Sequence, residues 1–171
     1  QLCSSPEFNP LHYGFDYAYG CLSGGIDPYN HKYKFEPWRT TWHRNGEVFD
    51  KLEPGHVTDL LTDDAIRWID EQRGPWFCYM PYTAVHTPIR APEQWIDRYW
   101  FQRMDPDPDR NRSYQQYAAY TGHLDYNMGR MIEHLKCLDQ IDNTIVVFVS
   151  DNGASTETIS SDTRFYPGWH E

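Results

Sequence analysis

Hydrophobic residues recur at the three- and four-residue spacing of an amphipathic helix in two stretches of the chain. The first stretch runs from Val57 to Gln72 and is closed by Gly-Pro at 74–75. The second starts at Ser113, a candidate N-cap, and continues to about Leu138 with apolar side chains along one side. The pattern therefore predicts one medium-length helix and one long helix.

Two uniformly apolar runs predict buried strands. Residues 76–80 (Trp-Phe-Cys-Tyr-Met) follow the first helix, and residues 144–149 (Thr-Ile-Val-Val-Phe-Val) follow the second. Strands that are apolar at nearly every position are typical of a parallel sheet covered on both faces. The order helix, strand, helix, strand therefore predicts an α/β fold, with a mostly parallel sheet flanked by helices.

The first 50 residues lack this periodicity and are rich in Gly, Pro, Tyr and Asn. They predict a loop-rich segment with short strands, and Asn45-Gly46 between two short runs predicts a two-residue hairpin. We expect one partial domain over 1–171, made of this segment, a helix–strand core over 57–153 and an irregular tail over 154–171.

Candidate chemistry lies in the loops that follow the two apolar runs. In open α/β sheets, ligands bind beyond the carboxyl ends of the strands, so these loops meet if the strands are neighbours. Asp151 and Asn152 offer oxygen donors suited to Ca²⁺ or Mg²⁺, although Asp-Asn-Gly also makes a plain turn and Ca²⁺ needs roughly 6–8 oxygens. His86 can donate a hydrogen bond to an anionic oxygen, or it can be structural.

The composition excludes some classes of binding partner and favours others. Fifteen Lys and Arg against 25 Asp and Glu give a net charge of −10, which argues against nucleic acid. No apolar run approaches the roughly 18 residues that span a bilayer, so the sequence predicts no membrane segment. Aromatic residues make up 16% of the chain, which suits either an ordinary core or a cleft for sugars. Four cysteines allow three pairings, and we expect Cys78 and Cys137 to be free, buried thiols.

Three segments, in this order and spacing, resemble the sulfatase family, the arylsulfatase-like branch of the alkaline-phosphatase superfamily. They are residues 6–10 with 14–27, residues 80–88 (Met-Pro-Tyr-Thr-Ala-Val-His-Thr-Pro) with 91–93, and residues 138–153, which end in Ser-Asp-Asn-Gly. The resemblance covers nearly the whole chain to about Gly153. It implies an alkaline-phosphatase-like fold, incomplete here, and the central part of a sulfatase domain.

The resemblance also implies an activity and its residues. Sulfatases hydrolyse aryl or carbohydrate sulfate esters with a formylglycine nucleophile and Ca²⁺. By similarity, Asp151 and Asn152 match the late pair of metal ligands, and His86 matches the histidine that contacts the sulfate. Asp27 and His31 fall where such proteins line the substrate pocket. The implied partner is a sulfated small molecule or glycan.

Several family motifs are absent. No cysteine is followed by the Cys-x-Pro-x-Arg pattern that yields formylglycine, the early Asp-Asp pair and Lys-x-His are missing, and no lysine follows Lys136. We therefore expect the nucleophile to come from outside this chain, with the rest of a parent sulfatase as partner. The isolated chain is then inactive, because covalent catalysis has no starting atom.

Two other functions remain open. A phosphatase or phosphodiesterase of the same superfamily uses a Ser or Thr nucleophile and two metals, but its late ligands are expected as Asp-His, so Asp151-Asn152 favours sulfate. A non-catalytic sugar-binding remnant fits the missing motifs equally well. The sequence determines neither the substrate nor the compartment, which leans towards periplasmic, secreted or lysosomal.

Overall fold

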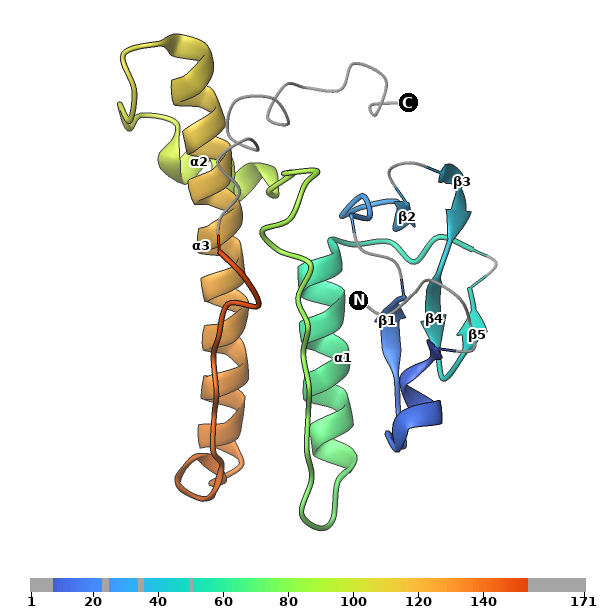
Figure 1. The fold of residues 1–171 in the computed structure, drawn as a ribbon. Coiled ribbons are helices and arrows are strands. Elements are labelled where there is room, and N and C mark those ends of the chain that lie inside the picture. Colours follow the sequence, from blue (N-terminus) through green and yellow to red (C-terminus); the bar gives the residue numbers. More distant parts are fainter. Residues whose placement is uncertain (1–7, 23–24, 34–35, 50, 154–171) are drawn as a thin grey trace. The chain divides into compact units, whose positions relative to one another are not determined.

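The computed structural model describes residues 8–22, 25–33, 36–49 and 51–153 (Figure 1). The chain divides into two compact units, Gln1–Arg90 and Ala91–Glu171, which are treated separately below. The predicted division into a loop-rich segment, a core and a tail stays a prediction, and the tail lies outside the described residues.

The first unit combines two small antiparallel sheets with one helix of 15 residues. The three-stranded sheet has the order β1-β4-β5, and the two-stranded sheet pairs β2 with β3. Its elements are the 3₁₀ helix η2 (Pro10–Tyr13), β1 (Tyr19–Cys21), β2 (Lys32–Tyr33), β3 (Glu36–Thr40), β4 (Trp42–Arg44), β5 (Glu47–Val48) and α1 (Val57–Glu71).

The predicted hairpin is confirmed. Strands β4 and β5 pair with His43 opposite Val48, joined by Asn45 and Gly46 at φ of 50° and 87°. Both φ values are positive, as a type I′ turn requires, and Asn-Gly is the dipeptide that tolerates them best. This turn matches the right-handed twist of the strands, so a local signal was sufficient here.

Helix α1 packs against the three-stranded sheet at β1, and its predicted extent is confirmed to within one residue. Ile26, Trp42 and Val57 form the centre of the core, each at most 3% exposed. Gly20 in β1 has a φ of 127°, and a Cβ there would lie 3.0 Å from Leu61 Cδ2. The absence of a side chain therefore lets β1 approach α1 closely.

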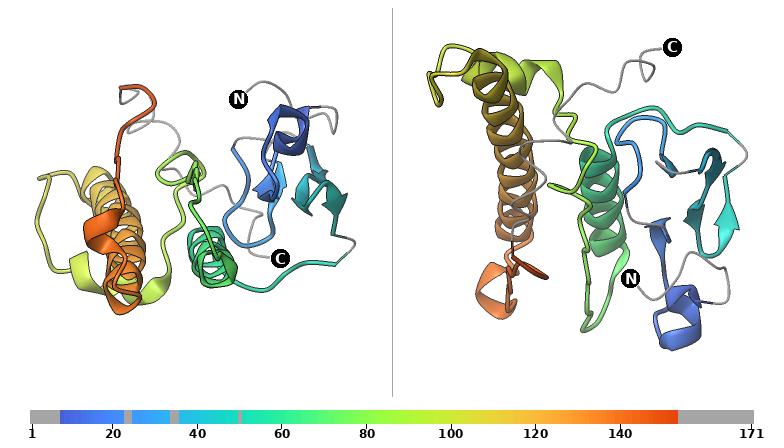
Figure 2. Two further views of the ribbon diagram at one scale, coloured as in Figure 1. Left: turned by 90° about the horizontal axis from the view of Figure 1, so that it is seen from below. Right: turned by 45° about the horizontal axis from the view of Figure 1, so that its top comes forward.

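The first apolar run is extended but unpaired, so the strand predicted over 76–80 is not formed in the described part of the chain. The segment runs back along α1, as Figure 1 and the right view of Figure 2 show. Trp76 packs edge-on against Trp68 with ring centroids 6.3 Å apart, while Phe77 is 73% exposed and Tyr79 66%. One side thus contacts α1, and the other lacks the neighbouring strands that a buried strand needs.

The second unit is built on two helices, α2 (Glu93–Tyr99) and α3 (Pro108–Cys137), followed by η3 (Ile141–Asn143). Helix α2 was not predicted. The expected N-cap of the long helix, Ser113, is wrong: Asp107 caps α3 by accepting from the backbone N–H groups of Asp109 and Arg110, each at 3.0 Å. Pro108 occupies the first helical turn, where a missing N–H costs nothing.

The buried face of α3 is more polar than its apolar pattern predicts. Buried residues recur every four positions at Gln115, Ala119, His123 and Asn127, and the other buried residues of α3 are Tyr120 and Leu135. Gln115 explains part of this: its Nε2 donates to the carbonyl oxygens of Trp100 and Gln102, 2.7 and 2.9 Å away. The buried side chain of Gln115 therefore binds the loop that follows α2.

The second apolar run is also unpaired. After η3 the chain turns back towards the N-terminal end of α3 (Figure 1), and residues 144–149 carry no strand pairing. Ile145 is 92% exposed and Val147 74%. Their apolar pattern indicates a strand covered on both faces, but within the described residues no strand pairs with them and most of their side chains are exposed.

The cysteines Cys21, Cys78 and Cys137 are free thiols, as predicted for the last two. Cys137, the last residue of α3, is exposed, so its predicted burial is wrong, and Cys78 is only half-buried. Among the described residues, no helix combines the length and the hydrophobicity needed to cross a bilayer.

Candidate functional site

Asp27 organises a tight turn over residues 27–32. Its side chain is fully buried, and Oδ1 accepts from the backbone N–H groups of Tyr29 and Asn30, both at 2.9 Å. The backbone closes the same turn, because Asp27 N donates to Lys32 O at 2.9 Å and His31 N donates to Asp27 O at 3.0 Å. The carboxylate therefore shapes the turn from inside.

His31 is also buried, at 1% exposure, and takes the left-handed conformation with a φ of 57°. Its ring stacks on Trp42 with centroids 4.4 Å apart. Burial lowers the pKa of His31, and the backbone of Gly55 and the carboxylates of Glu53 and Asp27 offset part of that effect. The imidazole is consequently neutral at physiological pH.

One carboxylate, that of Glu53, links Trp42, on which His31 stacks, to Tyr19. Glu53 Oε2 accepts from Trp42 Nε1 at 2.8 Å and from the Tyr19 hydroxyl at 2.5 Å. Burial and this hydrogen bond raise the pKa of Tyr19 above its ordinary value. Sequence reasoning missed Glu53, because no local motif marks a glutamate that ties two distant aromatic rings together.

His86 lies in the exposed loop after the first apolar run. Its backbone N donates to Thr83 O at 2.8 Å, and its Nδ1 lies 2.6 Å from Thr87 O. A carbonyl oxygen only accepts, so Nδ1 carries the proton in this contact. The other ring nitrogen, Nε2, is then the one left for a ligand.

Asp151 and Asn152 are exposed at the end of the second apolar run, in the second unit. Asn152 Nδ2 donates to Gly153 O at 2.9 Å, which leaves its amide Oδ1 as an acceptor. Asp27, His31 and His86 all belong to the first unit. The structure therefore places three of the predicted site residues in one unit and two in the other.

Two further residues connect the predicted site segments, and no motif in the sequence indicates that they are partners. Arg90, four residues after His86, forms an ion pair with the buried Asp27. His56, the N-cap of α1, has its Nε2 3.0 Å from Arg90 O. The turn over 27–32, the His86 loop and the start of α1 are thus joined at Arg90.

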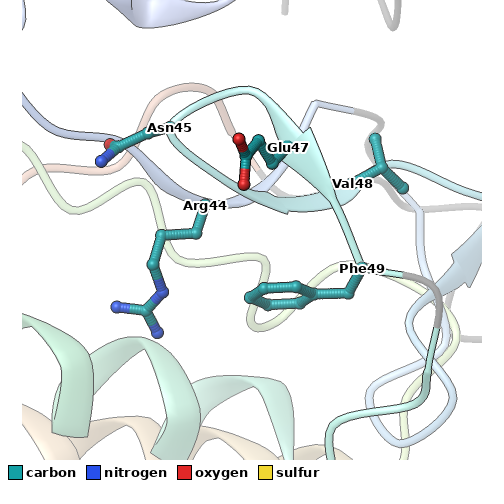
Figure 3. A pocket seen from close by; sticks show the side chains of 5 residues that line it. All are labelled: Arg44, Asn45, Glu47, Val48 and Phe49. Carbon is teal, nitrogen blue, oxygen red and sulfur yellow. The ribbon is translucent and has the colours of Figure 1, made fainter.

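A pocket lies at the hairpin, and none of the predicted site residues lines it. Its volume is about 440 Å³. Figure 3 shows the guanidinium of Arg44 and the ring of Phe49 facing the same space. The residues that line it are Arg44, Asn45, Glu47, Val48 and Phe49.

A charged cluster next to this pocket binds β4 to α1. Asp64, only 8% exposed, accepts from Arg44 and Arg67, each at 2.7 Å. The Tyr17 hydroxyl donates to the same carboxylate at 2.8 Å. Burial and the hydrogen bond to Asp64 raise the pKa of Tyr17 to about 12. Both guanidinium groups are already bound to Asp64, so the cluster is structural.

Comparison with known proteins identifies relatives over most of the chain. A family model described as Sulfatase matches residues 3–171. "Uncharacterized sulfatase YdeN" of Escherichia coli is 32% identical over 156 residues, which cover 88% of this chain and 25% of the relative. N-acetylgalactosamine-6-sulfatase of Homo sapiens is 28% identical, covering 88% of this chain and 28% of the relative. An arylsulfatase of Klebsiella aerogenes is 23% identical and covers 88% and 42%.

Two solved structures are similar to this chain in both sequence and fold. The crystal structure of Ps i-CgsB is 28% identical with a TM-score of 0.67, and its complex with k-i-k-neocarrahexaose is 27% identical with a TM-score of 0.65. Each match covers 82% of this chain and 33% of the other. The expected α/β fold class and the family resemblance are therefore confirmed. The chain spans between a quarter and two fifths of the curated relatives named above.

Proposed function

This chain belongs to the sulfatase family, and from that premise we propose that it is the central part of a sulfuric ester hydrolase. The observation that carries the proposal is the family match over residues 3–171, which includes all five predicted site residues. The reaction breaks the S–O ester bond and transfers the sulfuryl group to water, which releases an alcohol and sulfate. The formylglycine nucleophile comes from sequence outside this chain, and the chain alone is inactive.

His86 has the role of contacting the sulfate. Its Nδ1 donates to Thr87 O, which fixes the tautomer and orients the ring. The neutral ring then presents Nε2 as an acceptor, and on protonation Nε2 donates to an anionic oxygen. A histidine in an exposed loop keeps that nitrogen accessible to a substrate. His31 and the turn over 27–32 contribute to the substrate pocket, His31 as a neutral imidazole.

Asp151 and Asn152 have the role of holding Ca²⁺. A carboxylate oxygen and an amide oxygen are the hard donors that Ca²⁺ prefers, and the free Oδ1 of Asn152 fits this use. The bound cation supplies positive charge next to the sulfate oxygens. Two exposed donors make only part of a site, so the remaining oxygens come from elsewhere. An exposed Ca²⁺ site suits compartments rich in that ion, which supports a periplasmic, secreted or lysosomal location.

We extend the proposal to sulfated glycans as substrates. One relative is an N-acetylgalactosamine-6-sulfatase, and one structural neighbour was solved with k-i-k-neocarrahexaose. Aromatic side chains, 16% of this sequence, provide flat apolar faces on which sugar rings stack. An aryl sulfate is the simpler substrate against which this preference is measured.

The test uses the complete reading frame that contains this chain. Sulfate release from sulfated oligosaccharides and from an aryl sulfate is measured for the wild type, His86→Ala and Asp151→Asn. The matched control is His12→Ala, which removes an exposed histidine from η2. Both site variants are expected to lose at least 100-fold in kcat/KM, because contacts to the reacting group act in the transition state, and the control is expected to match the wild type.

The alternatives have distinct outcomes in the same assay. Release of phosphate from phosphate esters without sulfate release moves the protein to the phosphatase or phosphodiesterase branch. Glycan binding with no hydrolysis of either ester identifies a sugar-binding remnant. Wild-type activity in His86→Ala refutes the role given to that residue.

A further inference from the structure

Arg90 makes contacts with two elements that are distant in the sequence. Its guanidinium pairs with Asp27, 63 residues earlier, and its carbonyl oxygen accepts from His56 Nε2 at 3.0 Å. It stands four residues after His86, and between them Thr87 and Ile89 are 7% and 8% exposed. The His86 loop therefore ends at an anchored residue, although its tip is exposed.

Asp27 is a strong anchor because its carboxylate is fully buried. Oδ1 already accepts from two backbone N–H groups of its own turn, and Oδ2 receives Arg90. A buried carboxylate that loses its cation becomes an unpaired charge away from water, which is strongly unfavourable. The pair therefore resists separation, and the Arg90 side chain, 29% exposed, stays bound to the turn over 27–32.

A second layer of contacts fixes the direction of Arg90. Its guanidinium lies 5.1 Å from the ring centroid of Tyr29, and that ring meets His56 edge-on at 5.1 Å. His56 Nδ1 accepts from Thr58 N at 3.1 Å to cap α1, so its Nε2 carries the proton donated to Arg90 O. The helix start thereby determines where the Arg90 backbone lies.

We propose that Arg90 is a positioning residue that fixes the spacing between the His86 loop and the turn that carries His31. Because one side chain binds the turn while its backbone is held by α1, the two segments move as a single piece. Asp27 then acts through Arg90 and the turn instead of touching substrate. The consequence for catalysis rests on the proposed function, in which His86 contacts the sulfate.

The mechanical part is tested on this chain by hydrogen exchange with mass spectrometry. Arg90→Gln is expected to speed amide exchange in residues 27–32, and Asp27→Asn to speed it in residues 84–90, each by at least tenfold. Each variant thus reports on a segment that it does not alter covalently. The matched control, Arg73→Gln, removes an exposed arginine just after α1 and is expected to leave both segments unchanged.

Exchange in α1 separates local loosening from unfolding. If Arg90→Gln also opens α1, Arg90→Lys decides, because lysine keeps the charge and most of the packing; it is expected to hold α1 and loosen the turn by an intermediate amount. Wild-type exchange in 27–32 for both Arg90 variants, or in 84–90 for Asp27→Asn, overturns the proposal.

The catalytic part is tested in the complete enzyme with an aryl sulfate. Misplacing a contacting group by about 1 Å costs roughly 100-fold, so Arg90→Gln is expected to lower kcat/KM by 10- to 100-fold, mainly through kcat. Arg90→Lys is expected to recover part of the loss, and Arg73→Gln to lose nothing. Unchanged kinetics in a loosened Arg90→Gln overturns the positioning role. A wild type that releases no sulfate refutes the proposed function instead, and the exchange result is independent of it.

Discussion

Removal of the Asp64 carboxylate provides the most direct test of how the first unit is held together. The Asp64 carboxylate accepts from three groups: the Tyr17 hydroxyl lies 2.8 and 3.0 Å from its two oxygens, and Arg44 and Arg67 each donate to Oδ1 at 2.7 Å. These donors come from the segment before β1, from β4 and from α1 itself. The change Asp64→Ala removes the common acceptor and leaves all three donors in place.

The magnitude follows from burial on each side of the cluster. Breaking a buried ion pair costs about 3–5 kcal/mol, because the remaining partner is an unpaired charge. Here the Asp64 side chain is 7% exposed, but those of Arg44 and Arg67 are 35% and 45% exposed and remain hydrated. That exposure lowers the cost to about 2–3 kcal/mol in the free energy of unfolding. For a unit of 90 residues, this corresponds to roughly 10–20 °C in Tm.

Urea denaturation followed by far-ultraviolet circular dichroism measures the difference. The control is Asp63→Ala, the exposed neighbour on the same helix, which is expected to change the free energy of unfolding by less than about 0.5 kcal/mol. Asp64→Asn keeps one acceptor oxygen without the charge and is expected to fall between the wild type and Asp64→Ala. Equal urea midpoints for Asp63→Ala and Asp64→Ala would contradict the role of Asp64 in holding the first unit together.

Three further predictions follow from the perturbed groups. The pKa of Tyr17 is raised to about 12, so the unfolded chain loses the phenol proton at a lower pH than the folded chain, and stability falls as pH rises above about 10. Urea midpoints measured between pH 9 and 11 will fall less steeply in Tyr17→Phe than in the wild type. Burial lowers the pKa of His31, so its contribution to stability is present above about pH 6.5 and is lost at lower pH, where the unfolded chain binds the proton first. In the same assay at pH 5–7, His31→Asn, whose side chain tolerates the positive φ, will lose less stability on acidification than the wild type. Among the three described cysteines, pulse alkylation with peptide mapping will modify Cys137 before Cys21 and Cys78. Cys137 is exposed, whereas the other two thiols are partly buried and burial raises the pKa of both, that of Cys21 to about 12; labelling of Cys21 as fast as that of Cys137 contradicts this order.

Elements that depend on near neighbours in the chain were predictable. The Asn45-Gly46 hairpin and helix α1 each follow from a short pattern, and both are confirmed. The start of α3 was misjudged because two acceptors competed: Ser113 suits a cap, but Asp107 before Pro108 suits it better and gains the whole first turn. The sequence does not predict helix α2, because its seven residues are too few to show a clear helical period of hydrophobic positions.

Features that depend on distant partners were not predictable. The runs over 76–80 and 144–149 have the composition of buried strands, but a strand forms only where another strand receives its hydrogen bonds. The roles of Asp27 and Arg90 depend on a contact across 63 residues, and neither residue type nor spacing indicates it. The sequence predicts which segments carry chemistry, and the contacts of Arg90 in the structure join two of them.

The turn at Asn45-Gly46 also determines how this protein ages chemically. An asparagine before glycine loses its amide when the glycine nitrogen attacks the side-chain carbonyl and closes a succinimide ring. In the folded unit that nitrogen donates to His43 Nδ1 at 3.1 Å, and Asn45 Oδ1 accepts from Ala18 N at 2.9 Å. Burial lowers the pKa of His43 and keeps this acceptor unprotonated. Deamidation at Asn45 is therefore slow while the hairpin is intact and fast once it opens, so the fraction of isoaspartate at this position records how long each molecule has spent unfolded.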